Sequence, residues 1–180
     1  VKSAFFIWVN GEKVGYSQGS KLPAEFDITE FISIGKNSVA LQVYRWSDGS
    51  YLECQDFWRI SGIERDVYLS AEPKIRIVDF WAKTPLDHQF NNGELSLEID
   101  LFNDSITDEK ITVHTELLKA NGRRVLNRTD RIWLEANSPL GFNYKNTIRN
   151  VDAWTAETPN LYKLNITLKK GYKVISSISE

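Results

Sequence analysis

Acidic, cationic and aromatic side chains gather in one stretch of the sequence that shows neither strand nor helix periodicity. This stretch runs from Arg45 to Asp66 and contains Asp56, Trp58 and Arg59. Such a mixture suits a sugar, because its ring C–H groups lie against aromatic faces while carboxylates and guanidinium groups form paired hydrogen bonds with its hydroxyls. The carboxylate of Asp56 is also a suitable ligand for a hard cation. The stretch is therefore a candidate sugar-binding loop.

A purely structural role competes with this interpretation. Asp56 could form an ion pair with Arg59 or Arg45 that holds the loop, and structural pairs of this kind outnumber functional ones. The aromatic residues of the stretch are more often packed in a core or a loop than used as ligand platforms. They are Trp46, Tyr51, Phe57 and Trp58. Both interpretations stay open on the residues alone.

The sequence contains no recognisable catalytic constellation. Hydrolases that work with paired carboxylates hold two of them around the scissile bond in different environments, and no such pair can be identified. His88 and His114 are far apart in the sequence, and His114 falls on the polar face of an alternating strand. Neither a histidine triad nor a histidine metal site is supported. We predict that the chain carries no catalytic residue.

The segments around the candidate loop follow β-strand patterns. Asn10-Gly11 supplies the two positive-φ residues that a tight hairpin prefers, between two alternating runs. Further strands are predicted from Val39 to Arg45-Trp46, with Val39, Leu41 and Val43 facing inward, and over residues 65–69. Residues 48–51 are expected to form a turn.

A strand-and-turn rhythm of about ten residues continues through the second half, which suits a small β-sandwich. The apolar residues from Leu95 to Leu101 alternate with polar ones, so one face of that strand should be buried. A hairpin is predicted at Asn121-Gly122. We expect about seven strands and no helix here, and we place a domain boundary at Ala71-Glu72-Pro73, which gives domains 1–72 and 73–180.

The overall composition excludes several classes of partner. Lys and Arg number 22 against 24 Asp and Glu, so no broad positive field attracts nucleic acid. No apolar run is long enough to span a membrane, and the sequence beginning at Val1 matches no signal peptide. Cys54 is the single cysteine and cannot form an internal disulfide. We expect a soluble segment of a longer protein, with cytoplasm and periplasm both open as its compartment.

Three consecutive motifs of the candidate loop closely resemble the end of the sugar-binding jelly-roll domain of glycoside hydrolase family 2 β-galactosidases. They are residues 45–53, 55–63 and 65–67. Residues 8–11, 14–16 and 22–27 look like earlier strands of the same domain, and residues 154–162 resemble a segment of the family's first immunoglobulin-like domain. The resemblance implies an all-β fold in which a partial jelly-roll sandwich is followed by an immunoglobulin-like β-sandwich.

The resemblance also implies a function. The family hydrolyses terminal β-D-galactosides with retention, using two glutamates on a separate (β/α)₈ barrel, so this chain alone should be inactive. The aspartate at the place of Asp56 ligates a sodium ion and contacts the galactosyl hydroxyls, while Trp58 and Arg59 would support the loop. Cys54 departs from the family, because close relatives have an acidic residue at this position.

The same resemblance defines the expected cofactors and partners. Sodium would bind through Asp56, magnesium could bind in the barrel, and the isolated chain should hold neither tightly. The partners would be a β-galactoside and the catalytic barrel, in a parent that forms a homo-oligomer. The alternative is a self-standing β-sandwich module that binds carbohydrate or protein by itself.

Overall fold

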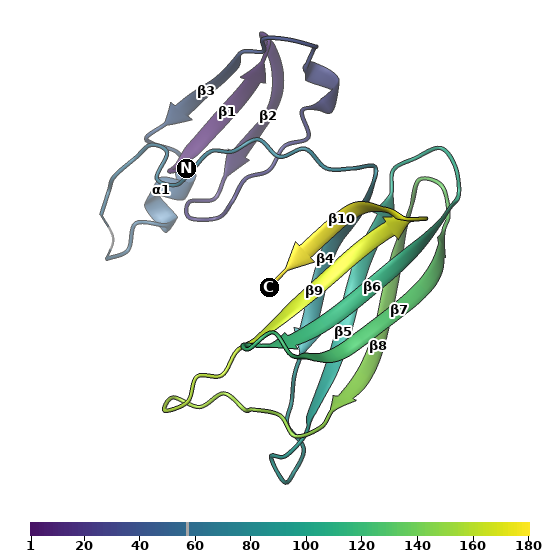
Figure 1. Ribbon diagram of the computed structural model, residues 1–180. Coiled ribbons are helices and arrows are strands. Elements are labelled where there is room, and N and C mark those ends of the chain that lie inside the picture. The colour runs from purple at the N-terminus through teal and green to yellow at the C-terminus, as the bar shows by residue number, and fades with distance from the viewer. Residues whose placement is uncertain (57) are drawn as a thin grey trace. The chain divides into compact units, whose positions relative to one another are not determined.

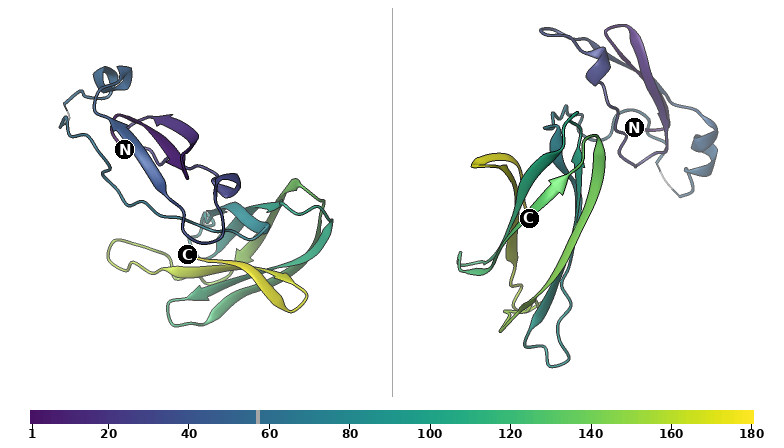
Figure 2. Two further views of the ribbon diagram at one scale, coloured as in Figure 1. Left: turned by 90° about the horizontal axis from the view of Figure 1, so that it is seen from above. Right: turned by 90° about the vertical axis from the view of Figure 1, so that its right-hand side faces the viewer.

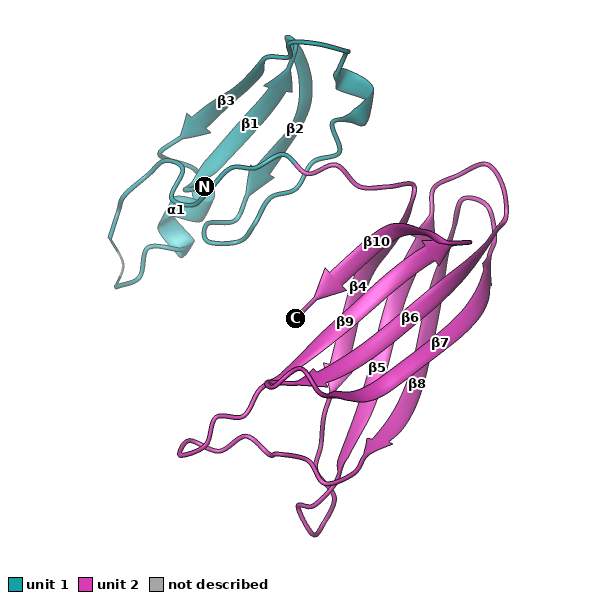
Figure 3. Cartoon of the chain, viewed as in Figure 1, with its two compact units in different colours: residues 1–69 teal, residues 70–180 magenta. Residues whose placement is uncertain are grey.

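The computed structural model describes residues 1–56 and 58–180, which form two compact units. Unit 1 comprises Val1–Leu69 and unit 2 comprises Ser70–Glu180 (Figure 3). Antiparallel strands dominate both units, so the all-β prediction is confirmed. Within the described ranges, no helix has the length and apolar character needed to cross a membrane.

Unit 1 is built on one three-stranded antiparallel sheet with the order β2-β1-β3 (Figure 1). The strands are β1 (Ala4–Val9), β2 (Glu12–Gln18) and β3 (Val39–Tyr44). Two short helices lie in the connections and are η1 (Thr29–Phe31) and α1 (Asp48–Leu52).

The hairpin between β1 and β2 is formed as predicted. Asn10 and Gly11 have φ values of 52° and 86°, which are the left-handed conformations that this tight turn needs. The Asn10 side chain also donates a hydrogen bond to the carbonyl of Phe31 at 2.8 Å and accepts one from the backbone N–H of Ser38 at 2.9 Å. The turn is therefore tied to the chain that precedes β3.

Three local predictions for unit 1 need correction. Val39 lies opposite the fully buried Val9, on the same face, yet it is 55% exposed because β3 is an edge strand. Residues 48–51 belong to the helical turn α1 rather than to a simple turn. Residues 65–69 form no strand, since an alternating pattern becomes a strand only where another strand edge pairs with it.

Unit 2 is a sandwich of two antiparallel sheets, with the orders β10-β9-β6-β7 and β4-β5-β8 (Figures 1 and 2). The seven expected strands are all present and no helix occurs in this unit. They are β4 (Ile75–Lys83), β5 (Gly93–Asn103), β6 (Glu109–Lys119), β7 (Arg124–Leu134), β8 (Ser138–Ile148), β9 (Tyr162–Lys170) and β10 (Lys173–Ser179). The predicted hairpin at Asn121-Gly122 joins β6 to β7.

The core of unit 2 lies between the inner faces of its two sheets. On β5, the residues Leu95, Leu97, Ile99 and Leu101 are at most 2% exposed. The alternating acidic residues of the same strand are exposed. Inward-facing residues of β6 and β9 pack against this row, among them the fully buried Ile166. The predicted burial of alternate positions is confirmed.

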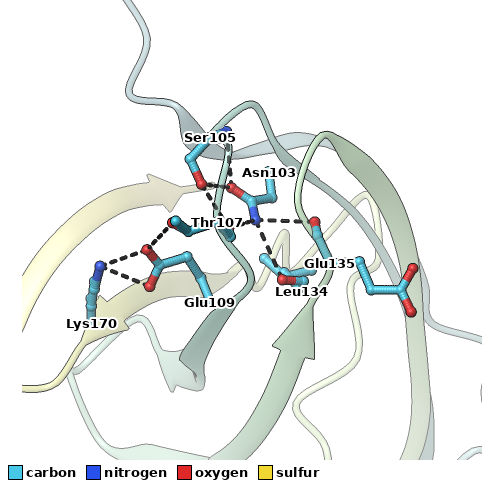
Figure 4. Close-up of polar contacts among 7 residues, drawn as sticks. All are labelled: Asn103, Ser105, Thr107, Glu109, Leu134, Glu135 and Lys170. Atoms are coloured by element: carbon cyan, nitrogen blue, oxygen red, sulfur yellow. Dashed lines mark hydrogen bonds and ion pairs between the residues drawn. The ribbon is translucent and has the colours of Figure 1, made fainter.

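A buried asparagine links the two sheets of unit 2 (Figure 4). Asn103, at the end of β5, is fully buried, and its Nδ2 donates to the carbonyls of Thr107, Leu134 and Glu135 at 2.9, 3.3 and 3.0 Å. Its Oδ1 accepts from the backbone N–H of Ser105 at 3.1 Å and from the Ser105 hydroxyl at 2.6 Å. Because Leu134 belongs to β7, this one side chain connects the end of β5 to the opposite sheet.

Candidate functional site

Within the candidate stretch from Arg45 to Asp66, the part that follows α1 in unit 1, residues 53–56 and 58–62, is called the loop from here on, and it presents Asp56 to the surface. Asp56 is exposed and has a φ of 48°, a left-handed conformation that aspartate tolerates better than most residues. Its carboxylate has no hydrogen bond or ion pair with any residue that the structure describes. The ion pair with Arg59 or Arg45, which the structural interpretation required, is therefore not formed among these residues.

The first end of the loop is held by α1 and by contacts with the end of β2. The backbone N–H of Glu53 donates to the carbonyl of Gly49 at 2.9 Å. The Glu53 carboxylate accepts the backbone N–H of Ser20, at 3.2 and 3.3 Å to its two oxygens. Gln18, the last residue of β2, donates through Nε2 to the carboxylate of Asp48. These bonds determine where the loop leaves α1.

The second end of the loop is held by Lys2, two residues before β1. Lys2 and Gly62 form a pair of backbone hydrogen bonds, each 3.0 Å between N and O. The Nζ of Lys2 donates to the carbonyl of Trp58 at 3.0 Å. Just beyond the loop, Lys21 forms an ion pair with Glu64, and the hydrogen bond from Lys21 lowers the pKa of the Glu64 carboxyl. Asp56 thus lies between two anchored ends.

The aromatic residues of this region are not core residues. Trp46, Tyr51 and Trp58 are 53%, 80% and 79% exposed, so the core position that the structural interpretation offered is wrong for them, whereas packing within the loop is not tested. Phe57 lies outside the described residues. The guanidinium of Arg45 lies 5.2 Å from the centre of the Trp46 ring, a cation–π distance. The stretch from Arg45 to Asp66 therefore carries both an exposed carboxylate and exposed aromatic side chains.

The concave space beside the loop is too small for a sugar. Lys2, Arg45, Cys54 and Arg59 contribute to the lining of a cavity of about 10 Å³. That volume holds about one water molecule, whereas pockets for small organic ligands are roughly 300 Å³ or larger. The loop of this chain presents groups outward and does not itself enclose a ligand.

A hard cation could use Asp56 as one ligand. Sodium and similar cations prefer several oxygen ligands, and an exposed carboxylate with no protein partner among the described residues meets that need for one of them. Over residues 1–56 and 58–180, no group of three or more His, Cys, Asp or Glu side chains is close enough to hold a metal ion. A cation held by Asp56 would therefore need ligands other than a cluster of three such side chains among these residues.

Lys2 is the residue of this region that sequence reasoning missed. A lysine at the start of an apolar run ordinarily indicates a solvated strand end, and nothing in its neighbours indicates burial. The structure nevertheless leaves Lys2 only 3% exposed, with its amine directed at the loop. No local pattern could have revealed this, because Lys2 and Trp58 are 56 positions apart.

Family models match the chain over almost its whole length. Residues 1–73 match the model described as "Glycosyl hydrolases family 2, sugar binding domain", and residues 75–180 match the one described as "Glycosyl hydrolases family 2". The chain is 45% identical over 170 residues to a β-galactosidase of Priestia megaterium, and 40% identical over 174 residues to one of Clostridium acetobutylicum. Each alignment covers 94% of this chain but only 16% and 18%, respectively, of those enzymes.

Solved structures share the fold at lower sequence identity. A Bacteroides uniformis β-glucuronidase matches 99% of this chain with a TM-score of 0.85 and 23% identity, and the match spans 22% of that protein. A calcium-binding mutant of Bacteroides uniformis β-glucuronidase 2 gives a TM-score of 0.88, again with 23% identity over 99% of this chain. These structures support the architecture alone, whereas the family models and the relatives at 40–45% identity establish descent. The chain belongs to glycosyl hydrolase family 2.

Proposed function

We propose that this chain is a non-catalytic portion of a β-galactosidase that hydrolyses terminal β-D-galactosides with retention. In this proposal the loop around Asp56 reaches a sugar site that a separate catalytic barrel completes, and unit 2 serves as a spacer. The similarity to β-galactosidases over 94% of the chain supports this substrate class. We further propose that the parent enzyme forms a homo-oligomer.

The observation that carries the proposal is the state of the Asp56 carboxylate. A structural aspartate in an irregular loop normally accepts hydrogen bonds or pairs with a cation, because an ionised carboxylate is a strong acceptor. Asp56 is exposed and has no such partner among the described residues, although both ends of its loop are anchored. A ligand site that this chain shares with a catalytic barrel needs a carboxylate that is held in place and is still able to bind the ligand.

The proposed roles divide between a sugar and a cation. The carboxylate of Asp56 would accept hydrogen bonds from galactosyl hydroxyls and would also ligate a sodium ion, while Trp58 and Arg59 support the loop. When bound, sodium would supply a fixed positive charge that polarises and orients a sugar hydroxyl. A magnesium ion, if the parent uses one, would lie in the barrel and would not involve this chain.

Replacing Asp56 with asparagine in the full-length enzyme tests the proposal. The substitution keeps the side-chain volume but removes the charge, and a charged hydrogen bond contributes about 1.5–3 kcal/mol. We therefore expect kcat/KM on a β-galactoside to fall about 10- to 100-fold, and the response of activity to sodium to weaken. The matched control is Asp100→Asn, which removes an exposed carboxylate from β5 of unit 2 and should leave kcat/KM unchanged. Unchanged kinetics for Asp56→Asn would refute the proposal.

The alternative is a self-standing module that binds carbohydrate or protein, and the exposed rings of Tyr51 and Trp58, in the same stretch of sequence as Asp56, favour it. Calorimetry with the 180-residue chain and galactose, in sodium and in potassium buffers, separates the two functions. A portion of a shared site should bind galactose weakly, because most of the contacts are missing. Tight binding that does not depend on sodium would instead establish the module.

A further inference from the structure

Lys2 is a buried lysine whose side chain reaches the candidate loop. Lysine is almost never fully buried unless its ammonium has partners, because removing that charge from water is costly. Lys2 is 3% exposed, and its Nζ donates to the carbonyl of Trp58 at 3.0 Å. A buried charge in this position calls for an explanation that a surface lysine would not need.

Lys2 contacts the half of the loop that follows Asp56. Its side chain holds residue 58, and its backbone holds Gly62 through two hydrogen bonds of 3.0 Å. The other half of the loop is anchored at Glu53 through α1 and Ser20. The Lys2 amine is thus bound two residues after Asp56, nearer to it along the chain than the anchors at Glu53 and Gly62.

We infer that Lys2 is a positioning residue, whose ammonium holds the backbone at Trp58 so that the carboxylate of Asp56 points out of unit 1. The inference rests on the proposed function, because it matters only if the Asp56 carboxylate contacts a ligand. A displacement of about 1 Å in a group that contacts substrate can cost on the order of 100-fold in rate. Loss of the amine should therefore reduce activity without changing any group that touches the sugar.

The surroundings of Lys2 contain charges of both signs. Arg45 and Arg59 line the same small cavity as Lys2, whereas the positive charge of Lys2 helps to lower the pKa of the Glu64 carboxyl. Like charges at close range oppose one another, and a well-packed apolar side chain often replaces a buried charge without loss of stability. Methionine has nearly the length of the lysine stem and carries no charge. We therefore expect Lys2→Met to fold.

A double-mutant cycle in the full-length enzyme tests the inference. The variants are Lys2→Met, Asp56→Asn and the combination of both, and kcat/KM is measured on a β-galactoside together with the sodium concentration that gives half-maximal activity. Lys36→Met is the matched control, because Lys36 is an exposed lysine of the same unit. Lys2→Arg keeps a charged donor at the position.

If Lys2 acts through Asp56, Lys2→Met should lower kcat/KM about 10-fold or more, raise the half-maximal sodium concentration, and have little further effect once Asp56 is asparagine. Lys36→Met should match the unaltered enzyme, and Lys2→Arg should restore most of the activity. Multiplicative losses in the double variant, or an effect of Lys2→Met no larger than that of Lys36→Met, would overturn the inference. If Lys2→Met does not fold, Lys2→Arg becomes the test of the inference. A folded Lys2→Arg enzyme whose kcat/KM is as low as that of Asp56→Asn would overturn the positioning role.

The two proposals fail in different ways. If Asp56→Asn leaves kcat/KM unchanged, the proposed function is wrong, whatever Lys2→Met does. If Asp56→Asn is impaired while Lys2→Met behaves like its control, the proposed function stands and the positioning role of Lys2 is wrong.

Discussion

Replacing Asn103 with alanine should lower the free energy of unfolding of unit 2 by about 3 to 5 kcal/mol. The Asn103 amide shares its two N–H groups among three backbone carbonyls, and at about 1 kcal/mol net per bond these contacts contribute about 2–3 kcal/mol. The carbonyl of Leu134 lies in the buried part of this network, so leaving it with one partner fewer adds a desolvation cost of about 1–2 kcal/mol. The sum exceeds the effect of most single substitutions.

Urea denaturation of the 180-residue chain, followed by far-UV circular dichroism, measures this effect as a shift in the midpoint of unit 2 with an unchanged slope. Asn143→Ala is the control, because Asn143 is exposed on β8, and its effect should stay within about 0.5 kcal/mol. Asn103→Asp should be at least as harmful as Asn103→Ala, because it directs a charged acceptor at carbonyl oxygens. A midpoint for Asn103→Ala equal to that of Asn143→Ala would refute the view that this side chain links the two sheets.

Three further predictions concern stability. Gly15→Ala should destabilise unit 1 by about 1–3 kcal/mol in urea denaturation, because the new Cβ would lie 2.5 Å from a ring carbon of Phe26; an unchanged midpoint would contradict this contact. The hydrogen bond from Lys170 lowers the pKa of Glu109, so unit 2 should lose stability as the pH falls below about 4.5, and Lys170→Met should flatten that dependence in denaturation curves measured against pH. Ile166→Ala, at a fully buried position, should cost about 2–5 kcal/mol by the same denaturation assay, and a loss under 1 kcal/mol would show that the core collapses around the cavity.

Several elements of the fold could be predicted from the sequence because they depend on neighbouring residues. The alternation from Leu95 to Leu101 predicts a strand with one buried face, and that strand is β5. The pair Asn10-Gly11 predicts a hairpin, since few other residues adopt two consecutive positive φ values. The family motifs of residues 45–63 predicted membership in glycosyl hydrolase family 2, which the family models confirm.

The predictions that failed concerned burial and strand formation, which depend on the strands that lie beside a segment. Val39 is on the expected face but stays exposed, because the edge strand β3 has no further strand beside it. Residues 65–69 alternate like a strand but find no edge with which to pair. In both cases the residues have the pattern of a strand, but no adjacent strand lies beside them. The local sequence does not specify such an adjacent strand.

The sequence by itself determined the class of the fold, the family and the position of the candidate loop, because these follow from local periodicity and from contiguous motifs. Only the tertiary structure decided that Asp56 is exposed without a partner among the described residues, and that Lys2 is buried against the carbonyl of Trp58. The physical reason is distance along the chain. Lys2 contacts Trp58 and Gly62, and Ser20 contacts Glu53, across segments that the pairing of β1 with β2 and β3 brings together, and no spacing in the sequence encodes these contacts.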